Sequence, residues 1–86
     1  MVVSFQRIFF VENTVKQIIA KCLLSDKSKI TSDTHLVEDL HVDSLELIDI
    51  IMTINETFGT DIDGVDFPEV ETVRGLCRVL KRKLTE

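Results

Sequence analysis

The sequence contains few of the residues that interrupt helices or build small β-barrels. Its 86 residues include three glycines, one proline, and neither tryptophan nor tyrosine. Small all-β domains need many turns and draw on β-favouring aromatic residues, so this scarcity favours helices. Hydrophobic residues make up 44% and charged residues 29% of the chain, a balance that fits a globular protein and argues against disorder. We therefore expect one all-α domain spanning residues 1–86, built on a single small core.

Cysteine is scarce, and no segment is suited to crossing or entering a membrane. Cys22 and Cys77 are too far apart for a metal-binding motif, and two lone cysteines on apolar faces are typical of buried side chains in a reducing, cytoplasmic protein. The N-terminal apolar stretch is interrupted by Gln6 and Arg7, is too short to span a bilayer, and lacks a secretory cleavage site. We expect residues 1–11 to form an extension that continues the first helix.

Positive charge is missing from the middle of the chain. No Lys or Arg occurs between Lys29 and Arg74, while this interval holds twelve of the fifteen acidic residues, and the net charge is −5. Such a field repels nucleic acid and anionic lipid and attracts basic protein surfaces. The pattern therefore predicts steering of basic protein partners; the alternative is a surface that only confers solubility.

The spacing of apolar residues predicts three main helices and one short helix. The first covers residues 5–24, although Asn13 could cap a shorter version. The second runs to residue 58, the last spans residues 72–84, and the broken segment before the last supports one turn over residues 66–70. Because a long loop follows the first helix, we expect a small four-helix bundle with a long first connection.

The second helix begins in the stretch VDSLELIDII, residues 42–51. Asp43 and Glu46 have the spacing of a capping box, in which each side chain accepts a hydrogen bond from the other residue's backbone N–H. Gly59 is a suitable left-handed stop at the other end. The motif therefore predicts that Ser44 lies in the first turn of this helix.

A helical projection divides the second helix into three faces. One face is a core stripe, made of Leu47, Ile50, Ile51, Ile54 and Phe58. The opposite face is polar and contains Glu46, Asp49, Thr53 and Glu56. A third group, next to Ser44, is apolar and consists of Leu45, Ile48 and Met52. This apolar arc is wider than one buried face requires, so either neighbouring helices cover both sides or the third group is a docking strip.

Ser44 is poorly equipped to be a nucleophile. The sequence has no G-x-S-x-G motif, and its two histidines, His35 and His41, come with no recognisable orienting acid. As a cap Ser44 would duplicate Asp43, but the positive end of a helix favours an anion attached there. A singly charged phosphodiester suits this position better than a doubly charged phosphomonoester, because Asp43 and Glu46 are close by. We therefore predict no catalytic residue and no enzyme.

The stretch LVEDLHVDSLELIDIIMTINETFGTDI resembles the acyl carrier protein family. The resemblance rests on D-S-L, on the preceding VEDL, and on the acidic and apolar helix that ends in F-G-T-D-I; it continues through ETV and covers roughly residues 12–84. It implies a four-helix bundle in which Ser44 carries 4′-phosphopantetheine, added from coenzyme A by a phosphopantetheinyl transferase. The thiol of that arm, and no group of the protein, would hold acyl chains as thioesters for fatty-acid (lipid) biosynthesis enzymes.

The same resemblance assigns further residues. The partner-binding residues would be Asp43, Leu45, Glu46, Ile48, Asp49, Met52 and Glu56, facing basic docking patches on partner enzymes. The acyl chain would lie in a core lined by Leu47, Ile51, Ile54, Phe58 and Ile62. The protein would be a cytoplasmic monomer without a metal. Family members often have Gly at the position of His41 and an acid at that of Asn55, so partner contacts there would differ.

The sequence also has features of a calcium-binding domain, of a specialised carrier and of an adaptor subunit. The segment GTDIDG is similar to a calcium-binding loop, but aligning Gly64 with the invariant glycine places Gly59 and Val70 where acids are required, which excludes an EF-hand. A carrier of polyketide, aminoacyl or D-alanyl groups, and an adaptor subunit without a prosthetic group, remain open alternatives.

Overall fold

The computed structural model describes residues 5–85, with side chains placed from Phe10 onward. Three α-helices form the framework: α1 (Phe5–Leu23), α2 (Ser44–Phe58) and α3 (Val73–Thr85). Two short 3₁₀ segments, η1 (Lys27–Lys29) and η2 (Gly64–Glu69), lie in the connections. The described residues include no β-strand, and an isolated bridge joins His35 to Thr72. The predicted all-α fold, with three main helices and a short one, is confirmed.

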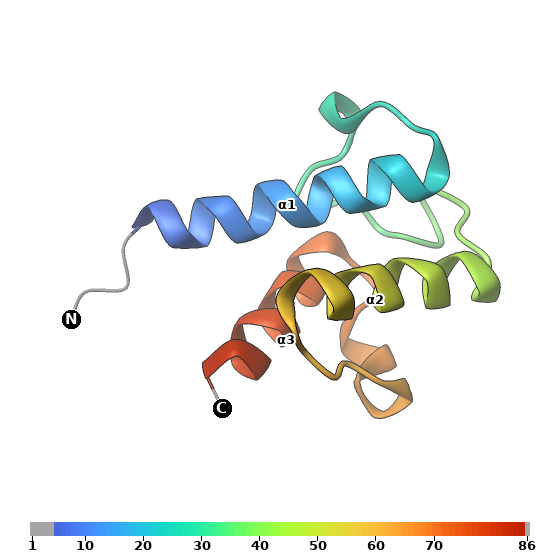
Figure 1. Cartoon of the computed structure of the whole chain (residues 1–86). Helices are drawn as coiled ribbons and strands as arrows, with labels where there is room; N and C mark the ends of the chain where they lie inside the picture. The colour runs from blue at the N-terminus through green and yellow to red at the C-terminus, as the bar shows by residue number, and fades with distance from the viewer. Residues whose placement is uncertain (1–4, 86) are drawn as a thin grey trace.

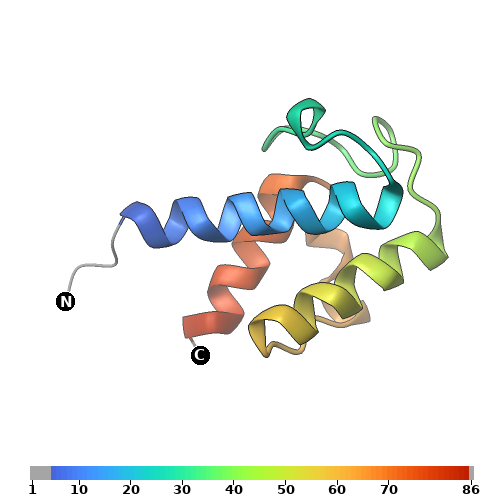
Figure 2. The same cartoon turned by 45° about the horizontal axis from the view of Figure 1, so that its top comes forward.

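Helices α1 and α2 run in opposite directions, and α3 passes behind the C-terminal half of α2 (Figure 1). The long connection between α1 and α2 arches over one end, while the N-terminal part of α1 projects beyond the other helices (Figures 1 and 2). The core lies where the three helices meet. Its fully buried larger side chains come from all three helices and two connections: Val15, Ile19, Leu36, Ile50, Ile54, Val70, Val73, Leu76, Val79 and Leu80.

The ends of the helices differ in part from the sequence prediction. Helix α1 includes Asn13 in its interior, so the shorter version capped at Asn13 is wrong. The helix ends at Leu23, because Leu24 takes a left-handed conformation (φ 53°) and the N–H of Ser25 donates to the carbonyl of Ala20. Residues 5–11 are helical, while residues 1–4 of the expected extension lie outside the described residues.

The short helix η2 begins earlier than the predicted turn over residues 66–70. Asp63 caps it: its carboxylate accepts from the N–H of Val65, and the carboxylate of Asp66 accepts from the N–H of Asp63. This reciprocal pair starts the helix at Gly64. Pro68 has no N–H to donate, and the segment ends at Glu69 as a 3₁₀ helix rather than continuing as an α-helix.

Within residues 5–85, no helix is both long and apolar enough to cross a membrane.

Candidate functional site

The capping box at the start of α2 fixes the position of Ser44. The Oδ1 atom of Asp43 accepts from the N–H of Glu46 at 2.8 Å, and the Oε1 atom of Glu46 accepts from the N–H of Asp43 at 3.1 Å. Asp43 is therefore the N-cap, as predicted, and Ser44 is the first helical residue. Its side chain is exposed, on a turn whose first N–H groups have no partner within the helix.

Backbone hydrogen bonds and two buried side chains anchor the loop before α2. The N–H of Leu36 donates to the carbonyl of Glu71 at 2.8 Å, and the N–H of Val42 donates to the carbonyl of Leu36 at 3.0 Å. The side chains of Leu36 and Val42 are both buried. Ser44 thus follows a backbone segment that is held to the residues preceding α3, which keeps the first turn of α2 in a fixed place.

His41 adopts an unusual backbone conformation in this loop. Its φ of 56° lies in the left-handed region, and its N–H donates to the carbonyl of Val37 at 3.0 Å. A non-glycine residue there has a conformational cost, since the Cβ atom approaches the following carbonyl. This left-handed conformation turns the chain sharply just before α2. The imidazole of His41 is exposed.

The apolar group beside Ser44 is exposed rather than covered by other helices. Leu45 is 77% exposed, Met52 is 55% and Ile48 is 43%. We call Leu45, Ile48 and Met52 the apolar strip. The sequence left two alternatives for these residues, and the structure decides against burial between helices. Acidic residues adjoin the strip on the same helix: Asp43, Asp49 and Glu56 are exposed, and Glu46 is half-buried.

The face of α2 that the helical projection assigned to the core stripe forms part of the core. Ile50 and Ile54 are fully buried and Ile51 is 4% exposed. Ile62 is buried next to them in the core, while Leu47 and Phe58 are half-buried and pack against it. The predicted core stripe is therefore confirmed as a packing surface, with Leu47 and Phe58 at its edge.

The cysteines and histidines do not form a nucleophilic site. Burial raises the pKa of the Cys77 thiol to about 11 and also raises that of Cys22, so both remain protonated thiols near neutral pH. His35 serves the loop: its Nδ1 atom accepts from the N–H of Glu38 at 3.0 Å, and its Nε2 atom lies 3.9 Å from a carboxylate oxygen of Glu71. Among the described side chains, no group of three His, Cys, Asp or Glu residues is arranged to hold a metal ion.

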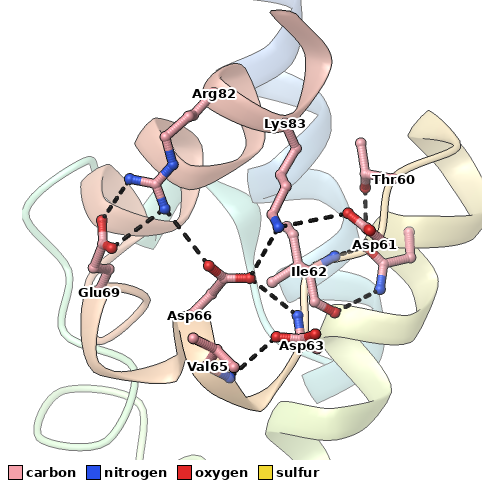
Figure 3. Close-up of polar contacts among 10 residues, drawn as sticks. Thr60, Asp61, Ile62, Asp63, Val65, Asp66, Glu69, Arg82 and Lys83 are labelled. Atoms are coloured by element: carbon pink, nitrogen blue, oxygen red, sulfur yellow. Dashed lines mark hydrogen bonds and ion pairs between the residues drawn. The ribbon is translucent and has the colours of Figure 1, made fainter. Parts of the chain in front are cut away.

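Two features of the site region were not predicted from the sequence. The side-chain amide of Asn55 bonds both backbone groups of Ile62. Arg82 and Lys83 pair with acidic residues of the segment around η2 (Figure 3). The spacing of Asp63 and Asp66 was a signal for the cap of η2, whereas nothing local indicates the pairing with α3.

A capped acidic helix that presents an exposed serine beside an apolar strip, in a small helical bundle, is the arrangement of a carrier domain. Comparison with known proteins agrees. The sequence model of the family described as "Phosphopantetheine attachment site" matches residues 13–80. The chain therefore belongs to the phosphopantetheine-attachment family, whose cofactor is phosphopantetheine and whose members act as carriers rather than as enzymes.

Individual relatives point the same way. An acyl carrier protein from Thermotoga maritima is 36% identical over 70 residues, which are 81% of this chain and 86% of the relative. An acyl carrier protein from Rickettsia massiliae is 33% identical over 73 residues, 85% of each chain. A solution structure from Anaplasma phagocytophilum, of a candidate acyl carrier protein, has a TM-score of 0.77 at 30% identity and covers 85% of this chain and 86% of its own.

Proposed function

We propose that this protein is an acyl carrier protein in which Ser44 carries the 4′-phosphopantetheine arm. The arm supplies a terminal thiol on which acyl groups are held as thioesters. The observation that carries the proposal is the placement of Ser44, an exposed hydroxyl on the first turn of α2, fixed by the Asp43–Glu46 capping box. The match to the family model described as "Phosphopantetheine attachment site" also supports the assignment, because the matched residues 13–80 include Ser44.

The residues around Ser44 are compatible with a phosphodiester. The exposed side chain leaves room for a transferase and for the arm, and the first-turn N–H groups with the positive end of the helix favour one negative charge. Asp43 and Glu46 use carboxylate oxygens for the two capping bonds, which directs these oxygens toward the backbone. The protein's contribution is therefore to present the attachment point and to keep it accessible.

The exposed side of α2 is proposed to receive partner enzymes. Its members are Asp43, Leu45, Glu46, Ile48, Asp49, Met52 and Glu56. Acids accelerate the encounter with a basic docking patch, and the apolar strip supplies contact area once the complex has formed. The partners would be a phosphopantetheinyl transferase and the enzymes of fatty-acid synthesis and acyl transfer, in the cytoplasm, where Cys22 and Cys77 would stay reduced.

The core side of α2 is proposed to shelter the acyl chain. Ile51, Ile54 and Ile62 are buried, and the half-buried Leu47 and Phe58 lie at the edge of the same cluster. A chain entering between them would remove its methylene groups from water, at about 0.8 kcal/mol for each buried group. The second candidate function differs only in the group that is carried. It is a specialised carrier of polyketide, aminoacyl or D-alanyl groups, which would use the same attachment site.

The test is the intact mass of the protein after incubation with coenzyme A, magnesium and a broad-specificity phosphopantetheinyl transferase. We expect a gain of one phosphopantetheine in the wild type and in the control Ser28→Ala, which removes another exposed serine, and none in Ser44→Ala. A gain that persists in Ser44→Ala would refute the assignment. No gain in the wild type would favour the adaptor subunit instead. Mass spectrometry of thioester-linked groups on protein from its own cell would then identify the cargo.

A further inference from the structure

The connection between α2 and α3 covers one side of the core, and we call residues 60–69 the strap. Ile62 is 3% exposed, and Phe67 is half-buried against the core. One end of the strap leads from α2 and the other leads to α3. The strength of its attachment to each helix therefore decides from which of the two helices the strap can separate.

On the α3 side the strap is held at several points (Figure 3). The guanidinium of Arg82 lies 3.1 and 3.2 Å from the two carboxylate oxygens of Glu69 and 3.5 Å from the carboxylate of Asp66. The Nζ atom of Lys83 lies 3.5 Å from Asp66 and 3.5 Å from Asp61. Asp66 is only 7% exposed, so its ion pairs are shielded from water more than ordinary surface pairs are.

On the α2 side the polar attachment is concentrated in one residue, Asn55, whose backbone carbonyl accepts from the N–H of Thr60 at 3.1 Å. The Nδ2 atom of Asn55 donates to the carbonyl of Ile62 at 3.0 Å, and its Oδ1 atom accepts from the N–H of Ile62 at 2.9 Å. The hydroxyl of Thr60 donates to the same Oδ1 atom at 2.9 Å. A single amide thus satisfies both backbone groups of the buried residue Ile62, as a neighbouring strand would in a sheet. A carboxylate at this position could accept but could not donate to the carbonyl.

We call the boundary between α2 and the strap the seam. We propose that Asn55 is a latch across the seam, and that the bundle opens by separating α2 from the strap while the strap stays attached to α3. Asn55 is a positioning residue: it holds Ile62 in place and thereby controls the passage of an acyl chain toward Ile54 and Ile62. The control of acyl-chain passage rests on the proposed function, whereas the opening between α2 and the strap does not. The seam ends at Gly59, which has a φ of 69° and terminates α2, so the strap turns away from the helix immediately beyond the latch.

The first test uses amide hydrogen exchange on the full, unmodified chain and does not involve Ser44. The variant Asn55→Asp keeps an acceptor for the N–H of Ile62 but loses the donor to its carbonyl, so faster exchange at Ile62 reports opening of the seam. Losing that bond and leaving the carbonyl unpaired should raise the exchange rate of Ile62 roughly tenfold. The matched control Thr57→Asp adds the same charge to an exposed position of α2 outside the latch and should leave Ile62 unchanged.

Arg82→Gln provides the converse comparison, because it weakens the attachment to α3. It should accelerate exchange at Val70, whose N–H donates to Phe67, more than at Ile62. The proposal is overturned if Ile62 exchanges at the same rate in Asn55→Asp and in the wild type. It is also overturned if Ile62 accelerates only in step with the core amide of Ile51, which would mean global unfolding rather than a seam.

The second test follows an octanoyl chain that a phosphopantetheinyl transferase delivers from octanoyl coenzyme A. The methyl signals of Ile54 and Ile62 should exchange between chain-in and chain-out positions roughly ten times faster in Asn55→Asp than in the wild type. Failure to load the wild type would refute the proposed function and leave the exchange test standing. Successful loading with equal rates in both proteins, or with no effect on these methyl groups, would refute the role of the latch in admitting the chain.

Discussion

Replacing Gly75 by alanine is the perturbation whose outcome the structure determines most sharply. Gly75 is buried in the first turn of α3, where its N–H donates to the hydroxyl of Thr72 at 3.0 Å. A Cβ atom on Gly75 would overlap the carbonyl oxygen of Glu69 and would lie 3.2 Å from its carbon and 3.3 Å from the hydroxyl oxygen of Thr72. The overlapping atom belongs to the backbone of η2, so no side-chain rotation relieves it. Either the strap or α3 must move.

Two opposing contributions set the change in the free energy of unfolding caused by Gly75→Ala. Alanine is favoured over glycine within a helix by about 1 kcal/mol. Forcing a methyl group into a filled space costs about 1–3 kcal/mol, occasionally more, and a backbone obstacle places Gly75→Ala at the upper end. A net loss of roughly 2 kcal/mol remains, which in a domain of this size lowers the Tm by about 8–16 °C.

Thermal and urea unfolding followed by circular dichroism measure this difference, with Gly64→Ala as the matched control. Gly64 also opens a helical segment, but its added Cβ would meet nothing within 4 Å and its φ is not positive, so we expect no loss of stability there. A Gly75→Ala protein as stable as the wild type, or more stable, would show that the close approach of η2 to α3 is not as described.

Three further outcomes follow from the site. Asp43→Ala removes the N-cap of α2 and should lower the free energy of unfolding by about 1 kcal/mol, measured in urea; an unchanged midpoint would contradict the capping role. Glu46→Lys or Asp49→Lys should slow association with a basic partner enzyme at low salt while altering stability by no more than about 0.5 kcal/mol, and equal binding rates would argue against docking through α2. The N–H of Asp63, donating to Asp66, holds the pKa of Asp66 below its usual range. Because the folded-state pKa is lowered, the stabilisation is present above about pH 4 and is lost as the pH falls through the lower, folded-state value, so Asp66→Asn should flatten this acid limb of the unfolding curve.

The features that the sequence predicted best depend on neighbouring residues. The start and end of α2 follow from Asp43, Glu46 and Gly59, whose effects act within one helical turn. The structure was needed for features that join distant segments. Asn55 becomes a latch only because the backbone of Ile62 returns to it, and Arg82 meets Asp66 only because α3 crosses next to η2. Likewise, the projection of α2 could not tell a covered apolar strip from an exposed one, since this depends on how the helices are arranged.

The acidic middle of the chain divides into two populations with different consequences. Three acids of the strap, Asp61, Asp66 and Glu69, pair with Arg82 or Lys83. Asp33 lies 2.7 Å from Arg74, so α3 compensates these four charges within the molecule. In contrast, among the side chains that the structure describes, no ion pair involves the acids of α2. The acids of α2 are therefore among those whose charge no ion pair compensates, together with the exposed Glu38 and Asp39 of the loop that precedes the helix. We expect a basic partner to approach α2 rather than the strap, because the basic groups of α3 weaken the negative field at the strap.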